Sequence, residues 1–268
     1  MEDLVVFPYK AKLPFAQIVA GKKVTTKEGA LIKVGDQALL DLSPFPGFSP
    51  YSLKETVKEF KSAFQKGLKD HRNPHVDFAL YQLQLQRDGL TSKVNIPPHN
   101  ILLDPLALRE SKNLKGVIKT KLRKDTFGII LKAIKDHPKV LWRLDGNAKF
   151  KRDDYLRMEE KLMRFQERID YIEEPLRDFK DYEACTLSYA HEEHWKLYLK
   201  ERTKACAVVV KPSQVGMSSL KKIKARLILS SCFETPPALH ALYYLAKKNA
   251  PETHGLGAFT TFDNLNWI

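Results

Sequence analysis

Six short apolar runs recur about every 20 residues through the second half of the chain, and each ends in polar or charged residues. The runs and these residues are GVIKTKL (Lys119, Lys121), VLWRLDGN (Asp145, Asn147), DYIEEPL (Glu173, Glu174), TLSYAHEE (His191, Glu192, Glu193), CAVVVKPS (Lys211, Ser213) and LILSSCFE (Ser231, Glu234). Helix-like stretches such as TFGIILKAIKDHP separate them. Strands that alternate with helices form parallel sheets, and the carboxyl ends of such strands meet around one site. The pattern therefore predicts a parallel β/α barrel with its chemistry at one rim.

The first 70 or so residues have a different pattern. LVVFPYKAKL, GALIKVG and QALLDL alternate like strands, and the polar segment AGKKVTTKEG between the first two is typical of a loop or hairpin. From Ser52 to about Leu68, apolar residues fall at spacings of three and four, and Ser52-x-x-Glu55 resembles a capping box. We therefore expect a small α+β domain before the barrel.

Composition limits the class of protein. With 268 residues, 43% of them hydrophobic, the chain can form one large domain or a large and a small one. The acidic start Met1-Glu2-Asp3 predicts no signal peptide, and no apolar run approaches the roughly 20 residues of a membrane span. Three cysteines, none in a CxxC pair, indicate reduced thiols in a cytoplasmic protein.

The net charge of +13 is compatible with an anionic partner such as nucleic acid, a membrane surface or an acidic metabolite. The lysines are scattered over many predicted helices, and there is no dense basic tail. This scatter favours a solvated lysine-rich surface and a small anionic substrate, with neither nucleic acid nor membrane as a partner.

Lys119 and Lys121 flank one residue of a predicted strand, so both side chains point to one face. Inside a barrel, like charge and partial burial would lower a lysine pKa and make one of the two a candidate general base. A surface strand with two solvated lysines is the alternative for this tripeptide.

Asp145 and Glu173 each follow an apolar strand and would project from the same rim. A few hard oxygen ligands with open positions suit Mg²⁺ better than Zn²⁺, with Mn²⁺ as an alternative ion. Helix N-capping is the other interpretation of each acid. Lys211 ends a buried strand on the opposite side. Together these groups predict removal of a proton next to a carboxylate, with a metal ion and a lysine stabilising the enediolate.

Several segments together form a specific set. They are Ser43-Pro44-Phe45-Pro46-Gly47-Phe48-Ser49, Lys119-x-Lys121, Arg143-x-Asp145-x-Asn147, Ile172-Glu173-Glu174-Pro175, Lys211-Pro212-Ser213 with Val215-Gly216, and Ser230-Ser231-Cys232-Phe233-Glu234. From about residue 30 onward, the chain resembles the muconate-cycloisomerase branch of the enolase superfamily, whose members use a Lys or His base with Mg²⁺. Within that branch, it resembles most the o-succinylbenzoate synthase family.

The resemblance implies an α/β fold, a modified (β/α)7β TIM-like barrel with a small N-terminal α+β capping domain. We expect the capping domain at residues 1–72, the barrel at 73–255, and a C-terminal segment at 256–268 that packs back on the cap. It also implies a cytoplasmic carbon–oxygen lyase of menaquinone biosynthesis, a monomer or homo-oligomer. The substrate would be a cyclohexadiene dicarboxylate, dehydrated to 2-succinylbenzoate.

By the same resemblance, Lys121 removes the α-proton and then assists departure of the hydroxyl as water. Lys119 holds down the pKa of Lys121, and Lys211 lies over the opposite face of the ring. Asp145 and Glu173 bind Mg²⁺. The residues expected to contact the substrate are Arg143, Asn147, Ser230, Ser231, and Gly47 and Phe48 of a turn that closes with residues 17–25 over the succinyl arm.

The third metal ligand departs from the family pattern. The family has an Asp-Glu pair where this chain has Ala190-His191-Glu192-Glu193. Direct superposition favours His191, and a slip of one residue favours Glu192. Because Mg²⁺ prefers oxygen, we take Glu192 as the hypothesis and His191 as its rival. Near the end, the family's GLDT becomes GLGA at residues 255–258, which removes an acid.

Two other functions are compatible with the sequence. An N-acylamino acid racemase or dipeptide epimerase of the same superfamily would use the same two lysines, one on each face of the substrate. A non-catalytic basic protein on a barrel scaffold would instead bind nucleic acid with a strong salt dependence. The scatter of the lysines counts against the second of these.

Overall fold

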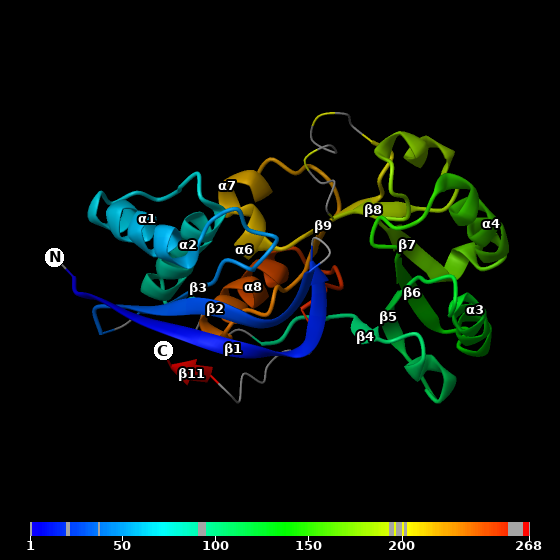
Figure 1. The fold of residues 1–268 in the computed structure, drawn as a ribbon, viewed down its shortest axis with the longest axis horizontal. Helices are drawn as coiled ribbons and strands as arrows, with labels where there is room; N and C mark the ends of the chain where they lie inside the picture. Colours follow the sequence, from blue (N-terminus) through cyan, green and yellow to red (C-terminus); the bar gives the residue numbers. More distant parts are fainter. Residues whose placement is uncertain are drawn as a thin grey trace.

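The computed structural model describes residues 2–19, 22–36, 38–90, 95–192, 196, 200, 203–256 and 265–267. Two sheets organise the chain, a four-stranded sheet in the order β11-β1-β2-β3 and a seven-stranded parallel sheet in the order β10-β9-β8-β7-β6-β5-β4. Figure 1 shows the long strands β1 and β2 beside α1, α2 and α8, with the curled parallel sheet extending away from them toward α3 and α4.

The four-stranded sheet contains β1 (Leu4–Val19), β2 (Lys22–Val34), β3 (Ala38–Leu42) and β11 (Leu265–Trp267). All three pairs are antiparallel, and β11 from the end of the chain pairs with β1 near its start. The polar segment at 20–29 was expected to be a loop or hairpin, and the hairpin alternative is confirmed, because β1 and β2 pair antiparallel with Val19 opposite Lys22. Val24, Thr25 and Thr26 are β-branched, and the segment pairs with β1 on both sides of an irregularity between Lys12 and Gln17.

The helices α1 (Leu53–Gln65) and α2 (Pro74–Arg87) cover this sheet, and α2 packs against β3. The capping box is confirmed, because the Ser52 Oγ accepts from the Glu55 N–H at 3.2 Å and the Glu55 carboxylate accepts from the Ser52 N–H at 2.9 Å. The core between them contains Ile32, Leu40, Leu42, Phe60, Val76, Ala79, Leu80 and Leu83.

The parallel sheet follows the order of the chain. Its strands are β4 (Ile101–Leu103), β5 (Gly116–Lys121), β6 (Val140–Asp145), β7 (Ile169–Glu173), β8 (Tyr189–His191), β9 (Ala207–Val210) and β10 (Leu227–Leu229). The other helices in the described residues are η1 (Ala107–Arg109), α3 (Phe127–Asp136), α4 (Arg152–Met163), η2 (Gln166–Arg168), η3 (Phe179–Ala184), α6 (Pro212–Val215), α7 (Met217–Leu220) and α8 (Pro236–Lys248). None of the described helices has the length and apolar character needed to cross a lipid bilayer.

Two residues connect the open edges of the curled sheet. His254 bridges to His99 before β4, and Gly255 bridges to Ser230 after β10. The Asn100 N–H donates to the His254 carbonyl at 2.8 Å, and the Gly255 N–H donates to the Leu229 carbonyl at 2.7 Å. This barrel-like sheet with an N-terminal α+β part confirms the predicted fold class.

Side chains alternate between the two faces of the curled sheet. Ile118, Trp142, Leu144, Ile172 and Tyr189 pack outward, in the same core as residues of α3 and α4. The residues between them point inward, where Tyr171, Ala190, Ala207, Val209 and Ile228 form a smaller cluster. Lys119, Lys121, Arg143, Asp145 and Glu173 share this inward parity.

Buried polar contacts connect the N-terminal sheet to the loop after β10. Asp41 on β3 accepts from the Tyr9 hydroxyl at 2.8 Å and from the Thr235 N–H at 3.0 Å. The Lys27 ammonium on β2 is buried and donates to the carbonyls of Cys232 at 3.1 Å and Phe233 at 2.8 Å. The segment before α8 is thereby attached to the N-terminal sheet.

His75 generates a prediction about stability and pH. Burial, followed by the nearby charge of Lys27, lowers the pKa of His75 from 6.5 to about 4, and its Nε2 lies 2.7 Å from the Ser49 Oγ. Between pH 6.5 and 4, the unfolded chain therefore takes up a proton at this site that the folded chain does not. Stability falls as the pH drops through this window, by about 3 kcal/mol in total.

We expect His75→Gln to remove this part of the pH dependence. The measurement is the free energy of unfolding by urea at pH 7 and pH 4, where the loss between the two values should be smaller by about 3 kcal/mol in the variant. His240→Gln on the exposed face of α8 is the control and should lose stability as the parent does. Equal losses in all three proteins would contradict the assignment.

Candidate active site

Two lysines and two carboxylates converge at the carboxyl end of the barrel strands. Lys119 and Lys121 lie at the end of β5, Asp145 ends β6 and Glu173 ends β7. The Lys119 Nζ lies 2.6 Å from the Glu173 Oε1 and 3.2 Å from the Asp145 Oδ2. The Lys121 Nζ lies 2.6 Å from the same Asp145 oxygen and donates to the Asn147 Oδ1 at 2.9 Å. The two lysines thus share one face, as the sequence predicts.

Burial makes these charges depend on one another. Burial alone would raise the pKa of Asp145, but the charges of Lys119 and Lys121 outweigh it and lower that pKa to about 2. Burial alone would lower the pKa of Lys119, but Asp145 and Glu173 outweigh it and raise that pKa. The pKa of Glu173 is raised, chiefly by burial, although Lys119 opposes the shift. The cluster therefore favours charged Lys119 and Asp145.

The carboxylates fit a divalent cation. Asp145 and Glu173 are 3% and 0% exposed, and the Glu173 Oε2 is buried with no hydrogen-bond partner. Oxygen ligands of this kind suit Mg²⁺. No three His, Cys, Asp or Glu side chains in the described part of the chain are grouped closely enough to hold a metal. In this arrangement, the Lys119 ammonium supplies the positive charge that both carboxylates require.

The direction of side chains along β8 distinguishes the two rival third ligands. Ala190 lies in the inward cluster, whereas Tyr189 packs outward, so the alternation directs His191 outward and Glu192 inward. The His191 ring is buried, lies near the rings of Phe179, Tyr182 and Tyr189, and has its Nε2 3.1 Å from the Thr203 Oγ1. This placement favours Glu192. Glu193 lies outside the described residues.

Lys211 lies opposite the cluster, directly after β9. Its ammonium forms an ion pair with Glu192 and lies 5.3 Å from the centroid of the Phe48 ring. Burial is the main cause that lowers the pKa of Lys211, and the positive charge of Lys119 acts in the same direction. The charge of Lys119 therefore acts on Lys211 across the barrel mouth.

A cavity of about 580 Å³ lies beside Lys211. Its lining comes from β1 and the turn before α1, from the α1–α2 connection, and from the segments after β8 and β9. Gly47 and Phe48 contribute to this wall, whereas the closure of their turn over a substrate stays a prediction. Gly47 has a φ of 84°, which favours glycine at this position.

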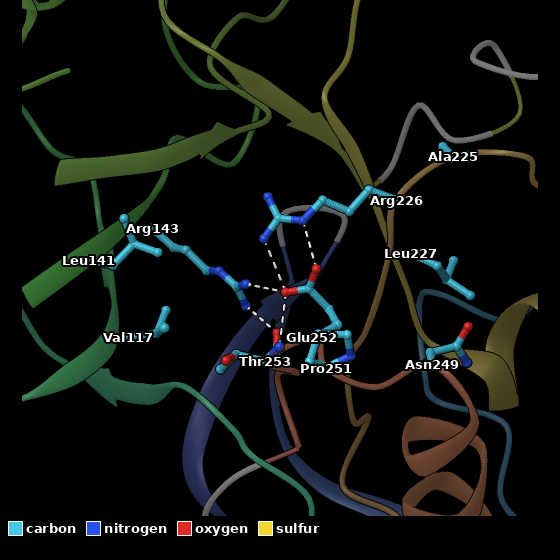
Figure 2. Close-up of a pocket in the computed structure, with 10 residues that line it drawn as sticks. All are labelled: Val117, Leu141, Arg143, Ala225, Arg226, Leu227, Asn249, Pro251, Glu252 and Thr253. Atoms are coloured by element: carbon cyan, nitrogen blue, oxygen red, sulfur yellow. Dashed lines mark hydrogen bonds and ion pairs between the residues drawn. The ribbon is translucent and has the colours of Figure 1, made fainter. Parts of the chain in front are cut away.

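Arg143 lies deeper in the barrel than Asp145. Its guanidinium forms ion pairs with Asp170 at 2.8 Å and Glu252 at 3.0 Å, and donates to the Thr253 carbonyl at 2.7 Å. Figure 2 shows Arg143 and Arg226 approaching Glu252 from two sides of a pocket. A substrate contact for Arg143 stays a prediction, because each of its nitrogens already has a partner.

Ser230 and Ser231 lie where the barrel closes. The Ser230 N–H donates to the Val210 carbonyl at 2.7 Å, and the Ser231 N–H donates to the Gly255 carbonyl at 3.2 Å. Their backbones therefore connect β9, β10 and the closing segment, while substrate contact by either hydroxyl stays a prediction. Of the segment GLGA at 255–258, in which the family has an acid, the structure describes residues 255 and 256, and residues 257 and 258 lie outside the described residues.

Sequence reasoning missed the residues that support the site from outside the barrel. Glu174 accepts from the Glu192 N–H at 2.6 Å and from the Tyr182 hydroxyl at 2.6 Å, which fixes the backbone after β8. Gly146 follows Asp145, and its N–H donates to the Glu173 carbonyl at 2.8 Å. The outward parity of Glu174 could have indicated a supporting role.

The comparisons with known proteins agree with this architecture. An o-succinylbenzoate synthase from Thermosynechococcus elongatus BP-1, solved with magnesium in its active site, superposes with a TM-score of 0.74 at 18% identity over 94% of this chain and 92% of that one. An enolase-superfamily member from Listeria innocua gives a TM-score of 0.70 at 15% identity, covering 96% and 85%. The fold is that of the enolase superfamily.

A solved structure of an epimerase is also similar to this chain. A dipeptide epimerase from Enterococcus faecalis V583, solved with Mg and L-Leu-L-Tyr, gives a TM-score of 0.72 at 17% identity, covering 95% of this chain and 89% of that one. In sequence, the chain is 20% identical to an o-succinylbenzoate synthase from Vibrio cholerae, over 98% of this chain and 91% of the relative. No protein-family model matches.

Gly146 generates a prediction about the loop that carries Asp145. A Cβ at this position would lie 2.7 Å from the Glu174 carbonyl oxygen and 3.0 Å from the Pro175 Cα, and both are backbone atoms. Gly146→Ala should therefore destabilise the protein by about 1–3 kcal/mol, as overpacking does. The measurement is the free energy of unfolding by denaturant.

Gly128→Ala is the matched control, because a Cβ at Gly128 within α3 meets nothing within 4 Å. This change should stabilise the protein by about 0.5–1 kcal/mol, through the better helix propensity of alanine. If the two substitutions had the same effect, the close approach at Gly146 would not limit that loop.

Proposed function

We propose that this protein is a Mg²⁺-dependent carbon–oxygen lyase that dehydrates 2-succinyl-6-hydroxy-2,4-cyclohexadiene-1-carboxylate to 2-succinylbenzoate in menaquinone biosynthesis. The observation that carries the proposal is the convergence of Lys119, Lys121, Asp145 and Glu173 at the barrel mouth, with Lys211 across from them. The similarity to o-succinylbenzoate synthases over nearly the whole chain supports this reaction among those of the superfamily.

In the proposed reaction, Lys121 in its neutral form takes the proton α to the ring carboxylate. The Lys121 ammonium then returns that proton to the departing hydroxyl, so that water leaves and the ring becomes aromatic. Asp145, Glu173 and Glu192 would hold Mg²⁺, which supplies positive charge to the substrate carboxylate while negative charge accumulates there. The Lys119 ammonium would also stabilise the negative charge that accumulates on the substrate carboxylate.

Lys211 and Phe48 would bound the substrate on the other side. Burial, the chief cause, lowers the pKa of Lys211 from its usual value, and in its charged form this group would lie against the ring in a site with little water. An ammonium over an aromatic face also stabilises the ring by a cation–π contact. We propose a small-molecule substrate and a cytoplasmic enzyme, monomeric or homo-oligomeric.

A second candidate function is the epimerisation of dipeptides or racemisation of N-acylamino acids. It is favoured by the placement of Lys121 and Lys211 on opposite sides of the barrel mouth, since two bases on two faces can exchange one α-proton. The likeness to the Enterococcus faecalis dipeptide epimerase supports it at the level of the fold.

Metal binding gives the first functional prediction. Asp145→Asn and Glu173→Gln should each weaken Mg²⁺ binding by at least about 10-fold, because even outer-shell partners of a metal typically contribute 10–100-fold. Titration calorimetry measures the affinity without any substrate. Glu192→Gln should weaken it as well, whereas His191→Gln should not. The reverse result for this pair would assign the third ligand to His191.

Turnover gives the second functional prediction. Lys121→Ala should reduce kcat/KM by about 10²–10⁴-fold, the usual contribution of a general base. The assay follows the absorbance of the new aromatic ring with the cyclohexadiene substrate, and deuterium exchange into dipeptides or N-acylamino acids in heavy water.

Lys135→Ala on the exposed face of α3 is the control and should retain parental activity. Ring dehydration without exchange supports the lyase, and exchange without dehydration supports the second candidate. If the parent protein had neither activity, or if Lys121→Ala kept full activity, the proposed mechanism would be wrong.

A further inference from the structure

The cavity beside Lys211 has an excess of positive charge. Among the described residues that line it, Arg72, Lys196 and Lys211 are basic, and Glu192 is the only acid. Glu192 is already paired with Lys211. The rest of the lining is apolar or neutral, with Phe48, Tyr51 and Val215 among its members. Such a cavity suits an anionic ligand with an apolar body.

Arg72 and Lys196 are the basic residues of this lining that the reaction described above leaves unused, and of the two Arg72 has the geometry of a carboxylate ligand. It lies on the connection between α1 and α2 and is exposed. Its guanidinium makes no hydrogen bond, ion pair or ring contact within the described residues. A guanidinium presents several donors in a fixed plane, and this geometry matches a carboxylate bidentately.

The backbone on both sides of Arg72 is fixed. The His71 N–H donates to the Asp77 Oδ1 at 3.2 Å, and the Asn73 N–H donates to the His71 Nδ1 at 3.1 Å. Asn73 is fully buried, its side chain donates to Glu59 at 2.9 Å, and its Oδ1 accepts from the His75 N–H at 3.1 Å. Only the Arg72 side chain therefore needs to be ordered when a ligand binds, which limits the entropic cost.

The same connection is attached to the barrel segment that follows Lys211. Asp77 accepts from the Ser218 N–H at 2.7 Å and from its hydroxyl at 3.2 Å. A Cβ at Gly216 would lie 2.9 Å from the Asp77 carboxylate and 3.0 Å from the Pro74 Cα, so these segments are in close contact. The position of Arg72 is thereby set relative to Lys211, although the two residues come from different parts of the chain.

We propose that Arg72 is a specificity-determining residue that binds the distal carboxylate of a dicarboxylate substrate. The inference rests on the proposed function, in which one carboxylate of the substrate lies at the Asp145–Glu173 end of the site. The arm that carries the second carboxylate then extends into the cavity, past Phe48 and toward the α1–α2 connection. Arg72 distinguishes dicarboxylates from monocarboxylates of the same shape.

The experiment compares two stable acids that differ only at the end of the arm. 2-Succinylbenzoate carries the distal carboxylate, and 2-butanoylbenzoate has a methyl group in its place. Both are titrated calorimetrically into the full-length protein with saturating Mg²⁺. The parent should bind 2-succinylbenzoate about tenfold or more tightly than 2-butanoylbenzoate, since a hydrogen bond to a charged group is typically this strong.

In Arg72→Gln this ratio should fall to near one, through weaker binding of 2-succinylbenzoate alone. Arg72→Lys should give an intermediate ratio, because it keeps the charge and loses the bidentate geometry. Arg152→Gln, at the exposed start of α4 outside the cavity, is the control and should keep the parental ratio.

The outcomes separate this inference from the proposed function. If the parent prefers 2-succinylbenzoate and Arg72→Gln keeps that preference, the role of Arg72 is overturned while the lyase proposal stands. If Arg72→Gln weakens the binding of both acids equally, Arg72 acts on the shape of the cavity, and its role in specificity is likewise overturned. If the parent binds neither acid, both proposals fall together.

Discussion

The structure of the barrel mouth depends on the compensation of charge at Asp145 and Glu173. Two carboxylates that are almost completely removed from water destabilise a protein unless positive charge lies beside them. Lys119 contacts both, and Lys121 contacts one. The same need for positive charge makes the pair a natural place for a divalent cation. The charge of the lysines and the charge of a bound metal ion can therefore each meet the same electrostatic requirement of the two carboxylates.

The second constraint is that one side of the cavity belongs to the N-terminal part of the chain. Phe48 lies over Lys211, and the contacts of Lys27 and Asp41 attach the N-terminal sheet to the loop after β10. The contacts of Lys27 and Asp41 join residues about 190 or more positions apart in the sequence. The site is thus assembled by long-range polar contacts as well as by the barrel. A change in the N-terminal sheet should therefore affect ligand binding more than the chemistry of the lysines.

Much of this site could be predicted from the sequence, because the positions of its side chains follow from patterns within single strands and from the order of the strands. Period-two alternation placed Lys119 and Lys121 on one face, and the succession of strands placed Asp145 and Glu173 at the same rim. Ser52 and Glu55 marked the start of α1 correctly. The hairpin predicted as one alternative for the polar segment at 20–29 is present, but the extent of β2 through that segment comes from pairing with β1 and not from an apolar face. The contacts of Glu174 and Gly146 join separate loops, which no local pattern encodes.

The ion pair between Lys211 and Glu192 links the charge balance at Asp145 and Glu173 to the cavity that the N-terminal part of the chain helps to form. In the proposed function, Lys211 lies over the substrate and Glu192 binds a cation with Asp145 and Glu173, so the ion pair between them would open. One movement would meet both needs, in which Glu192 turns from Lys211 toward the other two acids. Because the Glu192 N–H donates to the Glu174 carboxylate, we expect this movement to change the side-chain rotamer rather than the backbone. Cation binding and substrate binding should then support each other, because each removes Glu192 or Lys211 from the same pair.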